Sequence, residues 1–211
     1  MERKILVIAG ASGAGKTTVA SAMLKKYKEL GFVRSVTTRA PRGDGHDSEY
    51  IYIDREEFMR KALGGELVEY MQYGDNMYGT PISELKRIFE EGKIPLLILD
   101  VEGVKSLRKR SFDFTPVIVY LWEELSVIES RLYERDVKNS PTKEKLLSFE
   151  KRRAMNRRDY LCMPDIYPLF DLFIKNEGIE ASGEKIMKAL NESANQSENE
   201  KVARRLFEMV R

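Results

Sequence analysis

Cysteine and histidine are almost absent from the sequence, and their scarcity removes several kinds of chemistry. Cys162 is the single cysteine of 211 residues, so an internal disulfide and a cysteine-based zinc site are excluded. His46 is the single histidine, which excludes histidine-rich metal sites and argues against Ser-His or Cys-His nucleophile pairs. Any catalysis must therefore rely on other side chains.

Long hydrophobic runs and an excess of one charge are also lacking. The run KILVIAGA is too short to span a bilayer and is soon broken by glycine. The formal net charge is only +2, which argues against a dedicated nucleic-acid binder. We therefore expect a cytoplasmic protein without a membrane or nucleic-acid partner. With 42% hydrophobic and 33% charged residues, the chain suits one globular domain.

Hydrophobic periodicity predicts strands that alternate with helices. Apolar runs predict strands at residues 4–9, 32–37, 94–100, 116–121 and 171–176. Helical spacing predicts helices from Val19 to a stop at Gly31, from a Thr80 cap and Pro81 to Gly92, after 121 through Arg135, after Lys145 to about Tyr160, and at 182–190. This alternation is typical of an α/β fold with a parallel sheet covered on both faces.

Two segments depart from that rhythm. Residues 49–53 and 67–73 read as strands around a helix that begins at Asp54, with Glu57 completing a capping box. They predict a small β-containing lobe inserted into the core. At the other end, residues 191–200 read as a polar linker. Residues 201–211 place Val202, Leu206 and Val210 on one helical face, which predicts a short docking helix.

The segment GASGAGKTT follows the first strand and fits the Walker A pattern completely. Its glycines let backbone N–H groups turn toward phosphates, and the next helix adds its positive end. Lys16 is then expected to reach the β- and γ-phosphates, and Thr17 to ligate Mg²⁺. The alternative is a plain glycine-rich turn, which the preceding strand and following helix disfavour. The expected ATP-binding residues here are Gly10, Ala11, Ser12, Gly13, Ala14, Gly15, Lys16, Thr17 and Thr18.

The strand LLILD ends at Asp100 and resembles a Walker B strand, whose acid lies near the metal. This signal is weak alone, because buried strands often end in a polar residue. Beside a complete Walker A segment, it favours a functional role for Asp100.

Other segments point to the phosphate acceptor. In SVTTRAPR, Arg39 and Arg42 can present guanidinium groups to one anion, or they are solvated loop charges. Tyr50 and Tyr78 can donate to the same phosphate, or they are core aromatics. Glu69 offers a carboxylate that matches the N1–H and 2-amino edge of guanine, whereas adenine presents no such pair of donors.

Together these segments resemble the guanylate kinase family. The resemblance rests on GASGAGKTT, SVTTRAPR, Glu49-Tyr50, LVEYMQYGDNMYGT, LDVEGVKS and DLFIKNEG, between Lys4 and Gly178. It implies a P-loop kinase with a parallel central sheet flanked by helices, a small β-containing GMP-binding lobe and a helical lid. We expect one domain over 1–190, with a core at about 1–34, 79–134 and 162–190, a lobe at 35–78 and a lid at 135–161. A linker and helix then occupy 191–211.

The same resemblance implies residue roles. GMP-phosphate contacts fall to Ser35, Arg39, Arg42, Tyr50 and Tyr78, and guanine recognition to Glu69, Thr80 and Asp100. Asn176 joins the ATP-binding set, and Thr17 holds Mg²⁺ with Asp100 acting through a water. Catalytic roles fall to Lys16, Arg39, Arg135 and Arg152. Arg131 also belongs to the resembling lid segment, Arg153 competes with Arg152, and Thr80 has the bland alternative of a helix cap.

Three departures from the family pattern stand out. Ile98 lies where the family usually carries an acid, residues 136–148 exceed the usual lid turn, and the tail extends past compact members. The expected reaction is ATP + GMP ⇌ ADP + GDP with Mg²⁺, with GMP or dGMP as the acceptor, by a monomer or homodimer in purine nucleotide metabolism. Alternatives are a P-loop kinase of another nucleotide or sugar phosphate, and a non-catalytic protein-binding module. The intact Gly15-Lys16-Thr17 disfavours the module.

Overall fold

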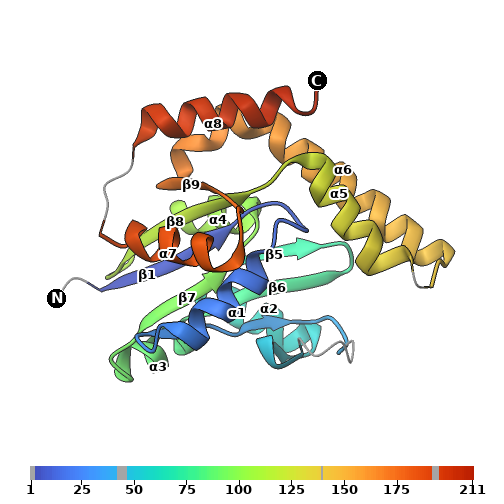
Figure 1. Cartoon of the computed structure of the whole chain (residues 1–211). Helices are drawn as coiled ribbons and strands as arrows, with labels where there is room; N and C mark the ends of the chain where they lie inside the picture. The colour runs from blue at the N-terminus through green and yellow to red at the C-terminus, as the bar shows by residue number, and fades with distance from the viewer. Residues whose placement is uncertain (1–2, 42–46, 139, 192–194) are drawn as a thin grey trace.

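A five-stranded parallel sheet forms the centre of the computed structural model, which describes residues 3–41, 47–138, 140–191 and 195–211 (Figure 1). Its strand order is β2-β7-β1-β8-β9. The strands are β1 (Lys4–Ala9), β2 (Leu30–Phe32), β7 (Ile94–Ile98), β8 (Thr115–Trp122) and β9 (Leu172–Lys175). Because both faces of this sheet are covered, its middle strands are continuous apolar runs.

Alternate residues of β1 point into two separate layers of core. Leu6 and Ile8 pack with Met23 of α1 (Lys16–Lys26) and Ile186 of α7 (Ile179–Ala189). Ile5 and Val7 pack in the second layer, which holds α3 (Ile82–Glu90), α4 (Val101–Arg108) and residues of three later helices. The expected α/β fold, a parallel sheet with helices on both faces, is confirmed.

A second, four-stranded sheet forms the small lobe, in the order β4-β3-β6-β5. Its strands are β3 (Ser35–Thr37), β4 (Tyr50–Tyr52), β5 (Leu67–Tyr73) and β6 (Asn76–Pro81). A 3₁₀ turn (Asp47–Glu49) precedes β4, and α2 (Arg55–Leu63) follows it. The Asp54 side chain caps α2 by accepting from Glu57 N–H, as predicted. Phe58 anchors a separate small core under this sheet.

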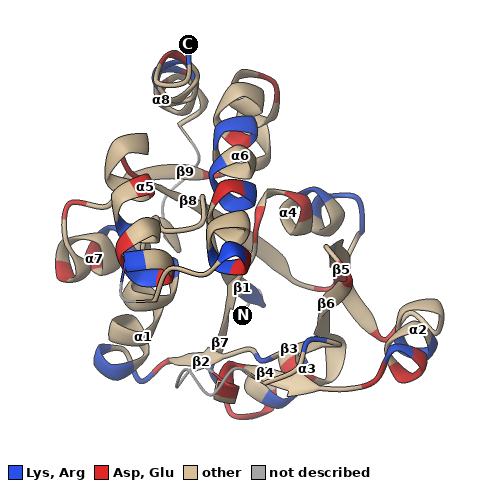
Figure 2. Ribbon diagram, turned by 90° about the vertical axis from the view of Figure 1, so that its right-hand side faces the viewer, with Lys and Arg blue, Asp and Glu red and all other residues tan. Residues whose placement is uncertain are grey.

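A helical pair projects from the core (Figure 1). It consists of α5 (Leu125–Tyr133), a π-helical segment (Glu134–Lys138) and α6 (Lys143–Ile166), which Thr142 caps by accepting from Lys145 N–H. Basic and acidic residues alternate along α6 (Figure 2). A 3₁₀ turn (Tyr167–Leu169) leads to β9. The final helix α8 (Gln196–Glu208) lies along α6, with Ala203 and Leu206 buried.

Several predicted boundaries are wrong. Helix α1 ends at Lys26, and Gly31 lies within β2, where an added Cβ would be 2.6 Å from the Ile88 side chain. The predicted strand at 32–37 is two strands in different sheets, β2 and β3. Helix α6 continues to Ile166, and α8 begins at Gln196 inside the expected linker. Within the described residues, no helix has the length and apolarity needed to cross a membrane.

Candidate active site

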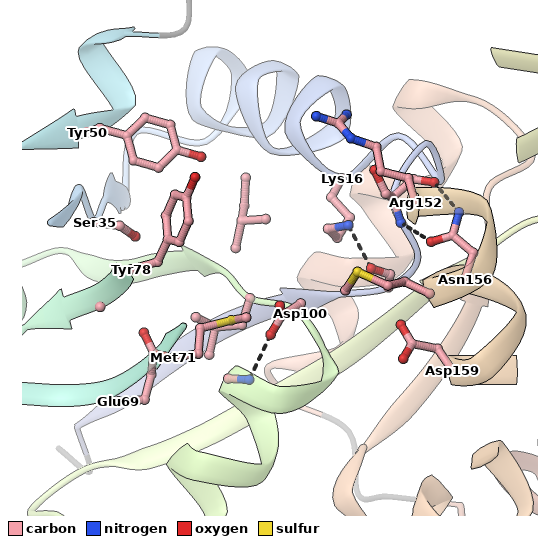
Figure 3. A pocket seen from close by; sticks show the side chains of 17 residues that line it. Lys16, Ser35, Tyr50, Glu69, Met71, Tyr78, Asp100, Arg152, Asn156 and Asp159 are labelled. Carbon is pink, nitrogen blue, oxygen red and sulfur yellow. Dashed lines mark hydrogen bonds between the residues drawn. The ribbon is translucent and has the colours of Figure 1, made fainter. Parts of the chain in front are cut away.

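A cavity of about 290 Å³ lies between the small lobe, the phosphate loop and α6 (Figure 3). Ser35, Tyr50, Tyr78 and Glu69 line it from the lobe, while Lys16, Arg152, Asn156 and Asp159 line the opposite side. Asp100 lies between these two groups. We call this space the acceptor cavity. Segments that are far apart in the sequence thus meet around one space large enough for part of a small ligand.

Two carboxyl groups, buried Glu69 and half-buried Asp100, line the acceptor cavity next to α4. Glu69 on β5 is only 3% exposed, and its Oε1 accepts a hydrogen bond from the Thr80 hydroxyl at 2.7 Å. Burial raises the pKa of Glu69 to about 7, although the Thr80 hydrogen bond opposes this. Asp100 caps α4 by accepting from Gly103 N–H at 2.8 Å, and burial raises its pKa too.

Gly103 allows α4 to approach both acids. A Cβ added there would lie 3.4 Å from Glu69 Oε2 and 3.4 Å from Asp100 Oδ1. Thr80 belongs to β6 and donates to Glu69, so the structure contradicts the predicted Thr80 helix cap. Pro81 occupies the cap position of α3 instead. This part of the cavity therefore presents two carboxyl groups, of which the Thr80 hydroxyl holds Glu69 and the Gly103 N–H holds Asp100.

The middle of the acceptor cavity carries hydroxyl groups. Tyr50 and Tyr78 lie edge to face with ring centres 6.2 Å apart, and Ser35 lies beside them. Arg39 lies behind Tyr50, with its guanidinium 5.2 Å from the centre of that ring. It donates to the Tyr52 hydroxyl at 3.3 Å and lies 3.9 Å from the Asp47 carboxylate. Arg42, the second predicted arginine of this segment, falls outside the described residues.

The phosphate loop depends on glycine at its ends. Gly10 has φ 148°, and a Cβ there would be 2.1 Å from Leu121 O. Gly15 has φ 96°, and a Cβ there would be 2.5 Å from Asn176 Nδ2. Neither position admits a side chain, so the loop keeps its backbone open toward a ligand. Helix α1 begins directly after it, at Lys16.

The Lys16 ammonium folds back onto this loop. It donates to Gly10 O at 2.7 Å and to Ala11 O at 2.9 Å. Burial lowers its pKa to about 8, against opposing contributions from Asp100 and Asp159. A phosphate ligand would offer this cation stronger acceptors than two carbonyl groups.

Two asparagines fix the loop from outside. Asn156 of α6 accepts from Ser12 N–H at 2.9 Å and donates to Ser12 O at 2.8 Å. Asn176, predicted as an ATP-binding residue, donates to Ala14 O at 2.7 Å. Asn156 was missed, although Arg152, Met155, Asn156 and Asp159 follow the i, i+3, i+4, i+7 spacing of one helical face.

Asp159 was missed as well. It lines the acceptor cavity, and burial together with the Asp100 charge raises its pKa to about 6. Arg152 lines the same cavity and lies 3.2 Å from Asp136, whereas Arg153 pairs with Glu129 at 3.1 Å. Of the two competing arginines, Arg152 is thus the one that faces the cavity.

A second cavity, of about 770 Å³, opens on the other side of Lys16. Gly13, Gly15, Thr17 and Thr18 line it from the loop, and Asn176 lines it from the end of β9. Arg131 and Arg135 also reach it; Arg131 lies 3.5 Å from Glu123, and Arg135 pairs with Asp136 at 2.7 Å. We call this space the donor cavity. Both cavities include Ser12 and Lys16, so they meet at the phosphate loop.

This arrangement defines a P-loop kinase of a small phosphorylated acceptor. The family model for guanylate kinase matches residues 2–193. A guanylate kinase of Sus scrofa is 31% identical over 89% of this chain and 91% of its own length, and one of Porphyromonas gingivalis is 34% identical over 89% and 96%. A solved guanylate kinase from Anaplasma phagocytophilum is 26% identical, with a TM-score of 0.61 over 90% of this chain and 85% of that one. The chain belongs to the guanylate kinase family.

Proposed function

We propose that this enzyme transfers the γ-phosphoryl group of ATP to GMP and releases ADP and GDP. The observation that carries the proposal is the buried Glu69–Thr80 pair at the far end of the acceptor cavity. An ionised carboxylate accepts two parallel N–H bonds, and the N1–H and 2-amino groups of guanine supply them. Family membership supports the same reaction.

The acceptor would then lie with its base at Glu69 and its phosphate toward Lys16. Asp100 joins Glu69 and Thr80 in recognising guanine. The hydroxyl groups of Ser35, Tyr50 and Tyr78 bind the GMP phosphate, together with Arg39 and Arg42. Arg39 lies behind Tyr50 and does not line the acceptor cavity, so it would have to move to bind that phosphate.

ATP would occupy the donor cavity with its phosphates in the loop of residues 10–18, next to Asn176. A GMP phosphate oxygen attacks the γ-phosphorus, and the bond to the bridging oxygen of ADP breaks. Lys16, Arg135 and Arg152 offset the charge that spreads over the transferring oxygens, and Arg131 approaches from the same lid. Closure of α5 and α6 over both nucleotides excludes water that would otherwise accept the phosphoryl group.

The protein side chains fit a magnesium ion that is carried largely by the ATP phosphates. Within the described ranges, no group of three or more His, Cys, Asp or Glu side chains could hold a metal by itself. Thr17 lines the donor cavity, and Asp100 lines the acceptor cavity beside Lys16. Mg²⁺ usually keeps several waters and takes one or two protein ligands plus phosphates, so Thr17 would bind it and Asp100 would act through a water. The ion would neutralise negative charge on the ATP phosphates.

We also propose that the reaction belongs to purine nucleotide metabolism and takes place in the cytoplasm.

A panel of acceptors tests the proposal. Purified enzyme with ATP and Mg²⁺ is assayed for ADP release with GMP, dGMP, AMP, CMP, UMP and ribose phosphates. We expect kcat/KM for GMP to exceed that for AMP by at least about a hundredfold, because a buried carboxylate facing adenine stays unpaired. Preference for an acceptor other than GMP or dGMP overturns the proposal, and so does the absence of any transfer.

A further inference from the structure

Helix α8 begins after residue 193, where the match to the family model ends, and it packs against α6 and the start of β9. Asn199, almost fully buried, donates to Phe170 O and Asp171 O at 3.2 Å each. Leu206 and Ala203 enter the main core. The helix is therefore fixed in position relative to the strands that lead to the donor cavity.

One arginine of α8 reaches the end of β8. Arg205 Nη2 lies 2.6 Å from Glu124 Oε1, and its guanidinium lies 5.2 Å from the centre of the Trp122 ring. Trp122 is buried, so this face of the indole ring is a fixed platform for the cation.

Lys175, at the end of β9, contacts the same carboxylate and the same indole ring as Arg205. Its ammonium lies 3.2 Å from Glu124 Oε1 and 5.4 Å from the centre of the Trp122 ring. Lys175 also lines the donor cavity and lies 4.0 Å from Glu123, which in turn lies 3.5 Å from Arg131. A continuous series of charges thus runs from α8 into the wall of the donor cavity.

Arg205 and Lys175 are both attracted by Glu124 Oε1, and the positive charge of Arg205 offsets the negative potential of Glu124 at the Lys175 ammonium. Because Arg205 pairs with Glu124, the Lys175 ammonium is held less tightly by that carboxylate. Lys175 can therefore attract an anion in the donor cavity more strongly. The residue after Lys175 is Asn176. Its side-chain amide donates to Ala14 O of the phosphate loop, and its backbone N–H donates to Trp122 O. The position of Lys175 is therefore coupled to the loop itself.

We propose that Arg205 is a positioning residue for the donor nucleotide: by sharing Glu124 and Trp122 with Lys175, it keeps the end of β9 arranged to bind ATP. This inference extends the proposed function, because it assigns ATP to the donor cavity. Arg205 is partly exposed, and pairs of this kind contribute up to about 1 kcal/mol, so we expect a weakening of about three- to fivefold.

The test compares Arg205→Gln with a matched control. Arg204→Gln removes the neighbouring arginine, whose guanidinium lies 2.7 Å from Glu200 of the same helix. Isothermal titration calorimetry measures the Kd for ATP without any acceptor and without a probe near Arg205. We expect the Kd and KM for ATP to rise about three- to fivefold in Arg205→Gln, with KM for GMP and kcat within about twofold of wild type. Arg205→Lys should recover most of the loss, and Arg204→Gln should match wild type.

A double variant tests the route of the effect. In a Glu124→Gln background, Arg205→Gln should cause little further change in ATP affinity, because the carboxylate that the two cations share is already gone. Equal ATP affinity in Arg205→Gln and Arg204→Gln overturns the inference, as does an equal loss of ATP and GMP affinity. Since the calorimetric titration with ATP needs no acceptor, failure of GMP phosphorylation in wild type would overturn only the proposed function.

Discussion

The hydroxyl of Thr80 donates a hydrogen bond to one carboxylate oxygen of Glu69 at 2.7 Å, and both side chains are buried. This contact joins the neighbouring antiparallel strands β5 and β6. It holds Glu69 Oε1 from the side of the sheet, while Gly103 leaves space next to Oε2. Thr80 thereby fixes the plane of the carboxylate that would read guanine.

Removal of the Thr80 hydroxyl should weaken the binding of GMP without weakening the binding of ATP. Thr80→Val keeps the shape of the side chain and the backbone N–H of residue 80 but removes the hydroxyl that donates to Glu69. Hydrogen bonds to charged groups contribute about 1.5–3 kcal/mol, so we expect KM for GMP to rise at least about tenfold. KM for ATP should stay within about twofold, and Thr80→Ser should restore GMP binding. Steady-state kinetics with each nucleotide varied separately provide the measurement; a parallel rise in both KM values would contradict this role.

Glu69 should also make GMP binding depend on pH. Burial raises its pKa to about 7, and only the ionised carboxylate can accept both N–H groups of guanine. GMP affinity should therefore be nearly constant above pH 8 and fall by up to about tenfold per pH unit below pH 7. The measurement is KM for GMP between pH 5.5 and 8.5.

The GMP phosphate itself titrates near pH 6, so a control is needed. Glu69→Gln keeps the phosphate titration and loses that of the side chain, so the difference between the two profiles isolates Glu69. The raised pKa means that the folded state binds this proton more tightly than the unfolded state. The contribution of Glu69 to stability is thus full below about pH 4.5 and declines as the pH rises through 7. Identical pH profiles for both proteins would contradict the assignment.

The phosphate loop could be predicted from sequence because its requirements are local. Gly10 and Gly15 need their backbone angles, and Lys16 follows at a fixed spacing. Gly31 could not be predicted in the same way, since a glycine after an apolar stretch suits a helix end as well as a strand. The packing of Ile88 against β2, which decides the matter, comes from a distant segment.

The lid residues show a second limit of sequence reasoning. Arg152 and Arg153 are chemically equivalent in the sequence, and only the phase of α6 against the core decides which one faces the acceptor cavity. That phase is set by buried Phe149, Tyr160 and Met163. Once it is known, Asn156 and Asp159 follow as members of the same face. The spacing in the sequence indicates that these residues share one face of a helix, but it does not show that this face lines the acceptor cavity.

Lys16 lies where the two cavities meet, so its loss should separate binding from transfer. Lys16→Ala should lower kcat/KM by about a hundred- to a thousandfold, because positioned charge at the transferring group contributes roughly 2.7–4 kcal/mol. The Kd for GMP, measured by calorimetry, should change less than about threefold, since guanine recognition lies at the other end of the cavity. Normal turnover in this variant would rule out the proposed mechanism.

Asn156 should couple the lid to the phosphate loop. Its amide both accepts from and donates to Ser12, so Asn156→Asp keeps the acceptor and removes the donor. We expect Asn156→Asp and Asn156→Ala to lower kcat/KM for ATP by about three- to thirtyfold, at about 1 kcal/mol per lost hydrogen bond. Ala154→Ser, at an exposed position on the same helix turn, serves as a control. Wild-type kinetics in both Asn156 variants would show that the loop holds its shape without α6.

Glu84 should stabilise the junction between the two sheets. It lies in the first turn of α3, directly after β6, and accepts from Arg34 Nη2 at 2.8 Å and Nε at 3.1 Å, directly before β3. Burial alone would raise the pKa of Glu84, but hydrogen bonds from Arg34 and Arg87 outweigh it and lower the pKa to about 2. Both chain crossings between the lobe and the core are thereby tied together.

Because the folded pKa of Glu84 is depressed, its stabilisation is full above about pH 4.5 and is lost as the pH falls toward 2. Arg34 and Arg87 are 46% and 44% exposed, so water screens the charges, and we expect Glu84→Gln to cost about 1–2 kcal/mol at pH 7. Glu91→Gln, which removes the exposed partner of Arg87, should cost less than about 0.5 kcal/mol. Urea unfolding at pH 7 and pH 3 provides the measurement. A Glu84→Gln deficit that persists undiminished at pH 3 would mean that side-chain packing, rather than the ion pairs, holds this junction.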